Sequence, residues 1–273
     1  MKAARSVAIA FLMLVFLAAL TPQSWIARHY ATQFRETPDA PPSAKFPLGT
    51  DAVGRDRLIR LMYGTRVSLL LAPAAALLSC IAAGALGGLA GLAGGLIDRA
   101  ILAAADLFLS LPWLFLLLMV RAALPLNVSP TASVTITFLL LGALGWAAPA
   151  RIVRASVRKL KTSDFMFVAR AQGCRPGRLL WRHLMPNLAP ILLAQFWVAV
   201  PVYILTETTL GMLGLGVAEP LPSWGGLLRE LESASFLTQP YLLAPALLLA
   251  AVTGSFQFAI APASSRTWQM RTD

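Results

Sequence analysis

The sequence predicts an all-α membrane protein with about six transmembrane helices. Hydrophobic residues make up 58% of the 273 positions and charged residues only 13%, whereas a soluble domain carries about 25% charge. Six apolar segments approach the roughly 20 residues that cross a hydrocarbon core. A break of 32 residues between two of these segments holds nine Lys and Arg residues and one acid, which is typical of a cytoplasmic loop.

The first expected span follows Lys2 and Arg5, and this pattern also suits a signal peptide. No small-x-small cleavage site follows Leu20, because Thr21, Pro22 and Gln23 come next, so we favour an uncleaved helix. The six spans are placed, in order, at residues 6–20, 67–92, 101–120, 133–150, 188–213 and 241–260.

These spans divide the chain into three parts. Residues 1–66 contain the first helix and an external segment that is extended and irregular around its four prolines between 38 and 47. Residues 67–265 form a five-helix core with a loop at 151–187, and residues 266–273 form a cytoplasmic tail. Glycines crowd the second span, and we expect them to permit close helix packing rather than to bind phosphate, because no strand precedes them.

The distribution of Lys and Arg places the N-terminus in the cytoplasm, because the later basic loops then lie inside. Segment 23–66 conflicts with this orientation, since it is external yet carries seven cations. Its length weakens the rule, so the later loops decide.

The basic break predicts a short cytoplasmic helix between the fourth and fifth spans. Thr162 or Ser163 is suited to cap it and Gly173 to end it. Phe165, Val168, Ala169 and Gln172 are spaced to share one face, and a second short helix is expected at 177–184. Such a helix suits contact with a soluble partner; the alternative is an amphipathic helix lying on the membrane surface.

Two acids lie in or near the spans, and an ionisable group at that depth faces the bundle or a water-filled path. Glu207 is well inside the fifth span and Asp106 is in the third. Both are candidates for residues that line a polar pathway or gate across the membrane. The alternative is a hydrogen bond between helices, which for Glu207 involves Thr206, Thr208 or Gln195, and which we favour for Asp106.

Catalytic patterns are missing from the sequence. No Gly-Lys dipeptide occurs, so the chain lacks a P-loop. The two histidines, His29 and His183, belong to no cluster with metal-ligand spacing, and Cys80 and Cys174 are not expected to form a disulfide. The net charge of +11 lies in loops between spans, so topology explains it better than nucleic acid does. We expect neither an enzyme nor a metal or cofactor site.

Four stretches, in order, resemble one family. Phe167-Val168-Ala169, Gly173 and His183-Leu-Met-Pro186 resemble the EAA loop of ABC-transporter permeases. Residues 47–56 with 63–68, residues 146–161, and residues 205–217 with 222–225 are similar to the dipeptide, oligopeptide and nickel importers of that family. The resemblance runs from about residue 46 to about residue 228.

This resemblance implies a six-helix permease subunit of an ATP-driven importer for peptides or similar solutes. It also implies partners: a homologous permease, two ATP-binding subunits that bind the ATP, and an external solute-binding protein. The short basic-loop helix would then be the coupling helix. The residues that it assigns to ATPase coupling are Phe165, Phe167, Val168, Ala169, Gly173, His183 and Pro186.

The sequence departs from the family pattern in three places. Phe167 stands where the EAA triplet has its glutamate, Ala103 stands near the place of an arginine in the third span, and 254–258 with a polar tail replaces a charged run after the last span. A stand-alone secondary transporter is the alternative function, although the chain shows no internal repeat.

Overall fold

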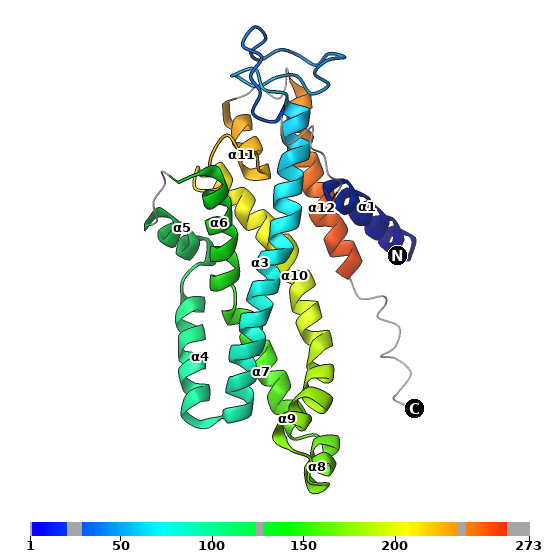
Figure 1. Ribbon diagram of the computed structural model, residues 1–273, viewed down its shortest axis with the longest axis vertical. Helices are drawn as coiled ribbons and strands as arrows, with labels where there is room; N and C mark the ends of the chain where they lie inside the picture. Colours follow the sequence, from blue (N-terminus) through cyan, green and yellow to red (C-terminus); the bar gives the residue numbers. More distant parts are fainter. Residues whose placement is uncertain (1, 21–28, 124–127, 234–238, 261–273) are drawn as a thin grey trace. The chain divides into compact units, whose positions relative to one another are not determined.

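The computed structural model describes residues 2–20, 29–123, 128–233 and 239–260. Within those ranges the protein is helical, and the one β pairing is an isolated bridge between Thr50 and Asp56 (Figure 1). Five helices are long and apolar enough to cross a membrane, or six if a bent pair counts as one span. The predicted fold class, about six spans with a short helix between the fourth and fifth, is therefore confirmed.

The elements follow in chain order. They are α1 (Lys2–Leu20), α3 (Arg57–Ala93), α4 (Gly95–Ser110), α5 (Trp113–Ala123), α6 (Pro130–Leu144), α7 (Ala147–Lys161), α8 (Asp164–Ala171), α9 (Pro176–Leu179), the π-helix η1 (Leu180–Leu184), α10 (Met185–Met212), α11 (Trp224–Arg229), η2 (Glu230–Ser233), η3 (Pro240–Leu243) and α12 (Ala244–Ile260).

The chain forms two compact units. The first unit contains Met1–Leu70 and Glu207–Asp273, and the second contains Leu71–Thr206. Helices α3 and α10 each contribute to both. The division at residues 66 and 265 predicted from the sequence concerns position relative to the membrane, which these contacts do not test. The tail at 266–273 lies outside the described residues.

In the first unit, α1 packs along α12, with the Phe16 and Phe256 rings 6.4 Å apart. The proline-rich segment is irregular, as predicted, yet it is held in place. Thr50 accepts a hydrogen bond from the Ala40 amide at 2.9 Å and donates one to the Thr37 carbonyl. These bonds give a segment without regular structure a fixed course beside the start of α3.

The third span differs from the continuous helix that the sequence predicts at 101–120. Helix α4 ends at Ser110, α5 begins at Trp113, and the two are bent by 89°. Leu111 is extended, with φ −92° and ψ 140°, because the ring of Pro112 disfavours the helical conformation for the residue before it. The proline was visible in the sequence, so the continuous span was an avoidable error.

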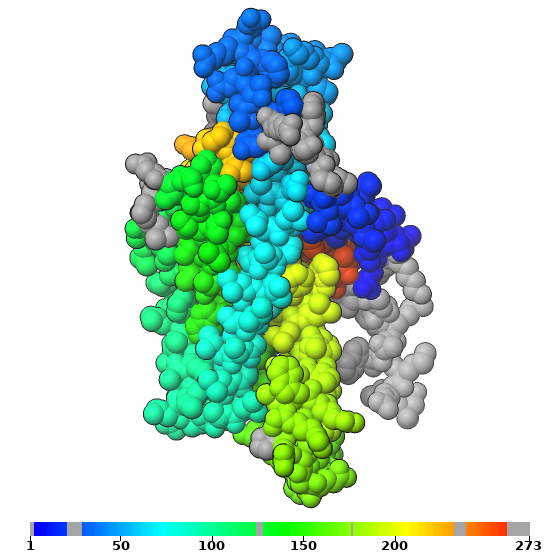
Figure 2. Space-filling model, in the orientation of Figure 1, coloured from blue at the N-terminus to red at the C-terminus, as the bar shows by residue number. Residues whose placement is uncertain are grey.

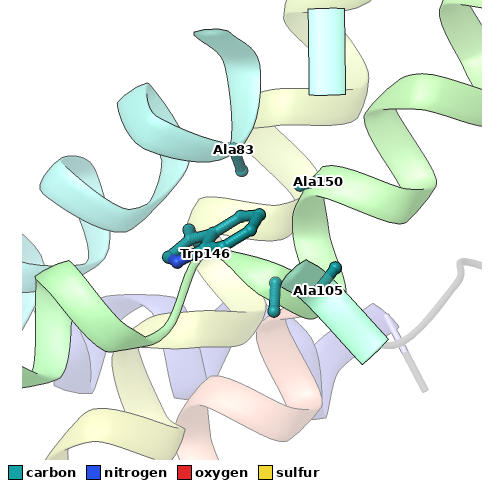
Figure 3. Close-up of a cluster of buried hydrophobic side chains, with 5 residues drawn as sticks. Ala83, Ala105, Trp146 and Ala150 are labelled. Carbon is teal, nitrogen blue, oxygen red and sulfur yellow. The ribbon is translucent and has the colours of Figure 1, made fainter. Parts of the chain in front are cut away.

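In the second unit, small residues bring α3, α4 and α7 together around Trp146. Ala83, Ala105, Ala147 and Ala150 pack with this indole in a buried cluster (Figure 3). Further along α3, a Cβ at Gly91 would lie 2.8 Å from the Val157 side chain. Close packing through glycine was predicted for α3, and these contacts confirm it.

Candidate coupling segment and buried polar sites

Helix α8 forms the end of the second unit, beyond α7 and α9 (Figures 1 and 2). Neither hydroxyl predicted to cap it does so. Ser163 Oγ donates to the Leu160 carbonyl at 2.5 Å, and Thr162 Oγ1 donates to the Lys159 carbonyl at 3.1 Å. Both side chains instead satisfy carbonyls at the end of α7, which have no partner within that helix. Asp164 is in the first turn of α8, where a negative charge complements the helix dipole.

The end of α8 matches the prediction for Gly173. This glycine has φ +71°, a conformation that side chains with a Cβ rarely adopt. The Cys174 amide donates to the Ala169 carbonyl at 3.1 Å and the Gly173 amide to the Arg170 carbonyl at 2.9 Å. These two bonds form a Schellman motif, which closes the helix and fixes the direction in which the chain leaves it.

Helix α8 exposes three large apolar side chains between Asp164 and Arg170, which are also exposed, and its orientation differs from the predicted face. The Phe167 side chain is 74% exposed, and Val168 and Phe165 are also exposed. Ala169, which the sequence placed on that face, is buried beside Met166. The helix therefore rests on Met166 and Ala169 and presents the other apolar side chains outward.

A second buried cluster joins α7 to the helical stretch that leads into α10. Val153 and Val157 of α7 pack against Leu184 and Leu188, and Leu92 at the end of α3 lies against them. The predicted short helix at 177–184 corresponds to α9 and η1, which run on without a break into α10. In that continuous stretch His183 is half-buried and Pro186 is exposed.

Acids of α4 pair with cations of α7. Arg154 forms two hydrogen bonds with the Asp98 carboxylate, one of them 2.6 Å from Nη2 to Oδ2, and Arg158 Nη1 lies 3.8 Å from the same group. Arg151 forms an ion pair with Asp106. Asp106 is thus a partner of α7, and its exposed carboxylate ties α4 to the helix that leads into α8. The sequence shows two acids in α4 and three arginines in α7, but it does not show that the two helices are neighbours. That contact comes from the fold.

Glu207 is completely buried in the first unit. Ser68 of α3 donates a hydrogen bond to Oε2 at 3.3 Å, and the Ser223 hydroxyl lies beside the carboxyl group. Oε1 makes no hydrogen bond of normal geometry with the described residues. Sequence reasoning identified the acid but not these serines, because they are far from it in the chain.

The same buried region holds α11 against α3 and α10. Trp224 donates its indole N–H to Thr65 Oγ1 at 3.0 Å, and Ser223 accepts a hydrogen bond from the Gly226 amide at 3.3 Å. A Cβ at Gly225 would lie 2.7 Å from the Gly211 Cα. Polar contacts and direct backbone packing together fix the start of α11.

An ion-pair cluster near the start of α3 was not found from the sequence. It comprises Arg55, Arg57 and Arg60 with Asp39, Asp51, Glu219 and Glu230. The Arg60 side chain is 1% exposed, and Nη2 lies 2.9 Å from Glu219 Oε1. Burial raises the pKa of the Glu230 carboxyl above its usual range, and the charges of Arg60 and Arg57 offset only part of this effect. The cluster ties the irregular segment before α3 to the loop that follows α10.

No group of three or more His, Cys, Asp or Glu side chains suited to hold a metal ion occurs in the part of the chain that the structure describes. Cys80 and Cys174 are both free thiols.

Comparison with known proteins identifies the family to which the chain is similar. Residues 83–266 match the family described as the inner membrane component of binding-protein-dependent transport systems. The chain is 33% identical over 225 residues to the oligopeptide transport system permease protein OppC of Bacillus subtilis, over 82% of this chain and 72% of that protein. It is 32% identical to the dipeptide permease DppC of the same organism and 31% identical to OppC of Escherichia coli, over 81% and 77% of this chain and 65% and 68% of the relatives.

The chain thus spans about two thirds of the length of these curated relatives. A binding-protein-dependent system relies on a solute-binding protein and an ATPase, which decides against a stand-alone secondary transporter, and its membrane component carries out no covalent chemistry. The chain is therefore a multi-pass inner-membrane protein that belongs to the family of permease components of binding-protein-dependent ABC transport systems.

Proposed function

We propose that this chain is a permease subunit of an ATP-driven importer for oligopeptides or dipeptides. The names of its relatives support this substrate class. The chain would form half of the translocation pathway with a homologous permease, and two ATP-binding subunits would bind the ATP. An external binding protein would deliver the solute. The chain itself would need no cofactor.

The observation that carries this proposal is the structure of α8 and its position at the end of the second unit. It is a short helix that exposes Phe165, Phe167 and Val168, is closed at its C-terminal end by a Schellman motif and is placed at the end of a long helical unit. Phe167 stands where the family has a glutamate, so we infer that the groove receiving α8 is apolar at this position. Phe165, Val168, Gly173, His183 and Pro186 remain in the proposed coupling segment, the last three as residues that shape it.

The second unit offers a route by which a displaced α8 would move the membrane helices. Met166 and Ala169 seat α8 on the unit, the cluster of Val153, Val157, Leu184 and Leu188 joins α7 to the start of α10, and Asp98 joins α7 to α4. Closely packed elements move together rather than deform. A displacement of α8 would therefore move α4, α7 and the first part of α10 together.

Replacing Phe167 by alanine is expected to weaken ATPase binding about tenfold, the size of effect that large apolar side chains at the centre of an interface contribute. Binding of the purified ATP-binding subunit to the permease pair, measured by titration in detergent, checks this. Leu96→Ala is the matched control, because Leu96 is 80% exposed in the same unit but lies on α4. Equal affinity of the Phe167→Ala and wild-type proteins would remove α8 from the interface.

Two other substitutions, Ala169→Arg in α8 and Gly173→Pro just after its end, would test the folding of the segment and not its docking. An arginine at position 169 would have to enter a buried site, and proline cannot adopt the positive φ of Gly173. Loss of ATPase binding in either variant would not separate contact from misfolding, whereas the side chain of Phe167 can be truncated without disturbing the core.

The N-terminus is proposed to lie in the cytoplasm. Of the cations in segment 23–66 that argue against this orientation, Arg55, Arg57 and Arg60 are paired with carboxylates. The rule counts Lys and Arg in short loops and near the ends of spans, so the length of this segment reduces the conflict, and the ion pairs give its cations a structural role.

A cysteine at Ala52 should react with an impermeant thiol reagent in intact cells, whereas a cysteine at Ala171 should react only after the inner face is opened. Both positions are exposed, and Cys80 and Cys174 would first be replaced by alanine. Ser223, which follows the fifth span in the sequence, is unsuitable because it is 1% exposed. Labelling of position 171 but not position 52 in intact cells would show that the topology is the reverse of the proposed one.

A further inference from the structure

The nine cations of segment 151–182 fall into two groups in the second unit. Those on α7 are largely used: Arg151, Arg154 and Arg158 pair with acids, and Lys161 donates to the Leu92 carbonyl at 2.7 Å. The other five, Lys159, Arg170, Arg175, Arg178 and Arg182, are exposed. Among them, Arg178 and Arg182 lie in α9 and η1, and neither side chain forms an ion pair or hydrogen bond with the described residues. Contacts within the chain therefore explain why four of the cations of α7 are present, but they do not explain the exposed arginines of α9 and η1.

Arg178 and Arg182 belong to a compact exposed surface. They are four residues apart in a continuous helical stretch, so their side chains leave the same side. Trp181, between them in sequence, is 70% exposed. Leu184 on the opposite side is buried with Val153 and Val157. We call Arg178, Trp181 and Arg182 the basic–aromatic patch; its helix is held to the protein by the opposite, apolar side.

The packing of the second unit fixes the level of the patch relative to the apolar spans. Leu184 packs in the same cluster as Leu92, which is the second-last residue of α3. Helix α3 ends there, before the turn at Gly94 and Gly95. The apolar part of α10 begins at Leu188. Trp181 and Arg182 therefore lie about one helical turn, roughly 5 Å, beyond the level at which α3 ends, and about two turns, roughly 10 Å, before the apolar part of α10 begins, which is at the depth of the polar headgroup layer.

Three properties of the patch fit one ligand chemistry. A guanidinium binds the oxygens of a phosphate in a bidentate manner. Exposed tryptophan is enriched at the membrane interface, where its ring sits at headgroup depth. The patch also lies in a helical stretch that continues into α10 and is held to α7 through the buried Leu184, so its arginines are presented by an ordered helix.

We propose that the basic–aromatic patch is a binding site for the headgroup phosphate of an anionic phospholipid in the adjoining leaflet. The lipid is favoured over the ATPase as the occupant because the patch lies at the level of the span ends, whereas α8, with exposed Phe167, lies farther out along the segment. The site would hold the base of α10 at a fixed depth while α8 is moved by its partner.

The test uses the assembled transporter in bilayer discs made of phosphatidylcholine with a minority of phosphatidylglycerol. Selectivity for spin-labelled phosphatidylglycerol over phosphatidylcholine is measured at low and high salt. In Arg178→Gln/Arg182→Gln we expect this selectivity to fall by about fivefold for each arginine removed. Trp181→Ala should weaken binding of both lipids while leaving most of the selectivity.

The matched control is Arg170→Gln/Arg175→Gln, which removes two exposed cations of the same segment that lie farther from the span. Selectivity should be retained in this control. An equal fall in both double variants would mean diffuse attraction by net charge and would overturn the site. Unchanged lipid selectivity with loss of the ATP-binding subunit from Arg178→Gln/Arg182→Gln would make the patch a protein contact and would also overturn it.

Discussion

Replacing Arg60 by methionine is expected to destabilise the first unit by about 3 kcal/mol, the lower end of the cost of removing one partner from a buried ion pair, because Asp51 is buried while Glu219 is about half exposed. Methionine fills the same space, so the loss is mainly electrostatic. The carboxylates of Asp51, Glu219 and Glu230 would face one another with only Arg55 and Arg57 to compensate them. Thermal unfolding of the purified protein, together with protease cleavage within residues 29–56, measures the effect.

Arg35→Met provides the control for this substitution. Arg35 is an exposed arginine of the irregular segment before α3, and a surface change of this kind usually alters stability by less than about 0.5 kcal/mol. Adding Glu219→Gln to Arg60→Met should recover part of the loss, because one uncompensated carboxylate is removed. Equal stability of Arg60→Met and Arg35→Met would show that the cluster does not hold the irregular segment.

The second large effect is expected at Glu207. Truncation to alanine should cost about 3 kcal/mol, because it leaves a cavity and removes the acceptor of a buried serine hydroxyl. Glu207→Gln retains the size of the side chain and an acceptor for Ser68. Since Glu207 is wholly buried between α3, α10 and the start of α11, we expect the glutamine variant to assemble and to take up peptide like the wild type.

Uptake and assembly together separate the two roles of Glu207. The structural role predicts that the alanine variant yields less intact complex and that its remaining complex transports normally. Normal assembly of Glu207→Gln with impaired or altered peptide uptake would instead place this acid on the transport pathway. Asp106→Asn provides a comparison with Glu207→Gln. It also removes the charge of a carboxylate in a helix, but this carboxylate is exposed and paired with Arg151.

The spans were predictable because lipid imposes length and polarity on each segment independently of the rest of the chain. Residues 67–92 and 188–213 correspond closely to parts of α3 and α10. The end of α8 was predictable for the same kind of reason, since a residue free of a Cβ best suits the conformation at Gly173. These features depend on neighbours in the sequence.

Pairings between distant segments were not predictable. Asp98 and Arg154 lie 56 residues apart, and Arg60 and Glu219 are 159 residues apart, and no local pattern specifies either pair. The buried side of α8 was misjudged for a related reason. Periodicity assigns residues to a common face but does not say which face meets the protein, so Ala169 was placed outward and Met166 was overlooked.

The contact between α8 and an ATP-binding subunit is the central claim, and site-specific photocrosslinking tests it most directly. A photoreactive amino acid would replace Phe167 in cells that express the whole transporter, with Leu96 as the matched exposed position on α4. Illumination should join position 167 to the ATP-binding subunit, in a yield that changes when ATP is bound, and should give no such adduct at position 96. An ATPase adduct at position 96 with none at position 167 would contradict the account.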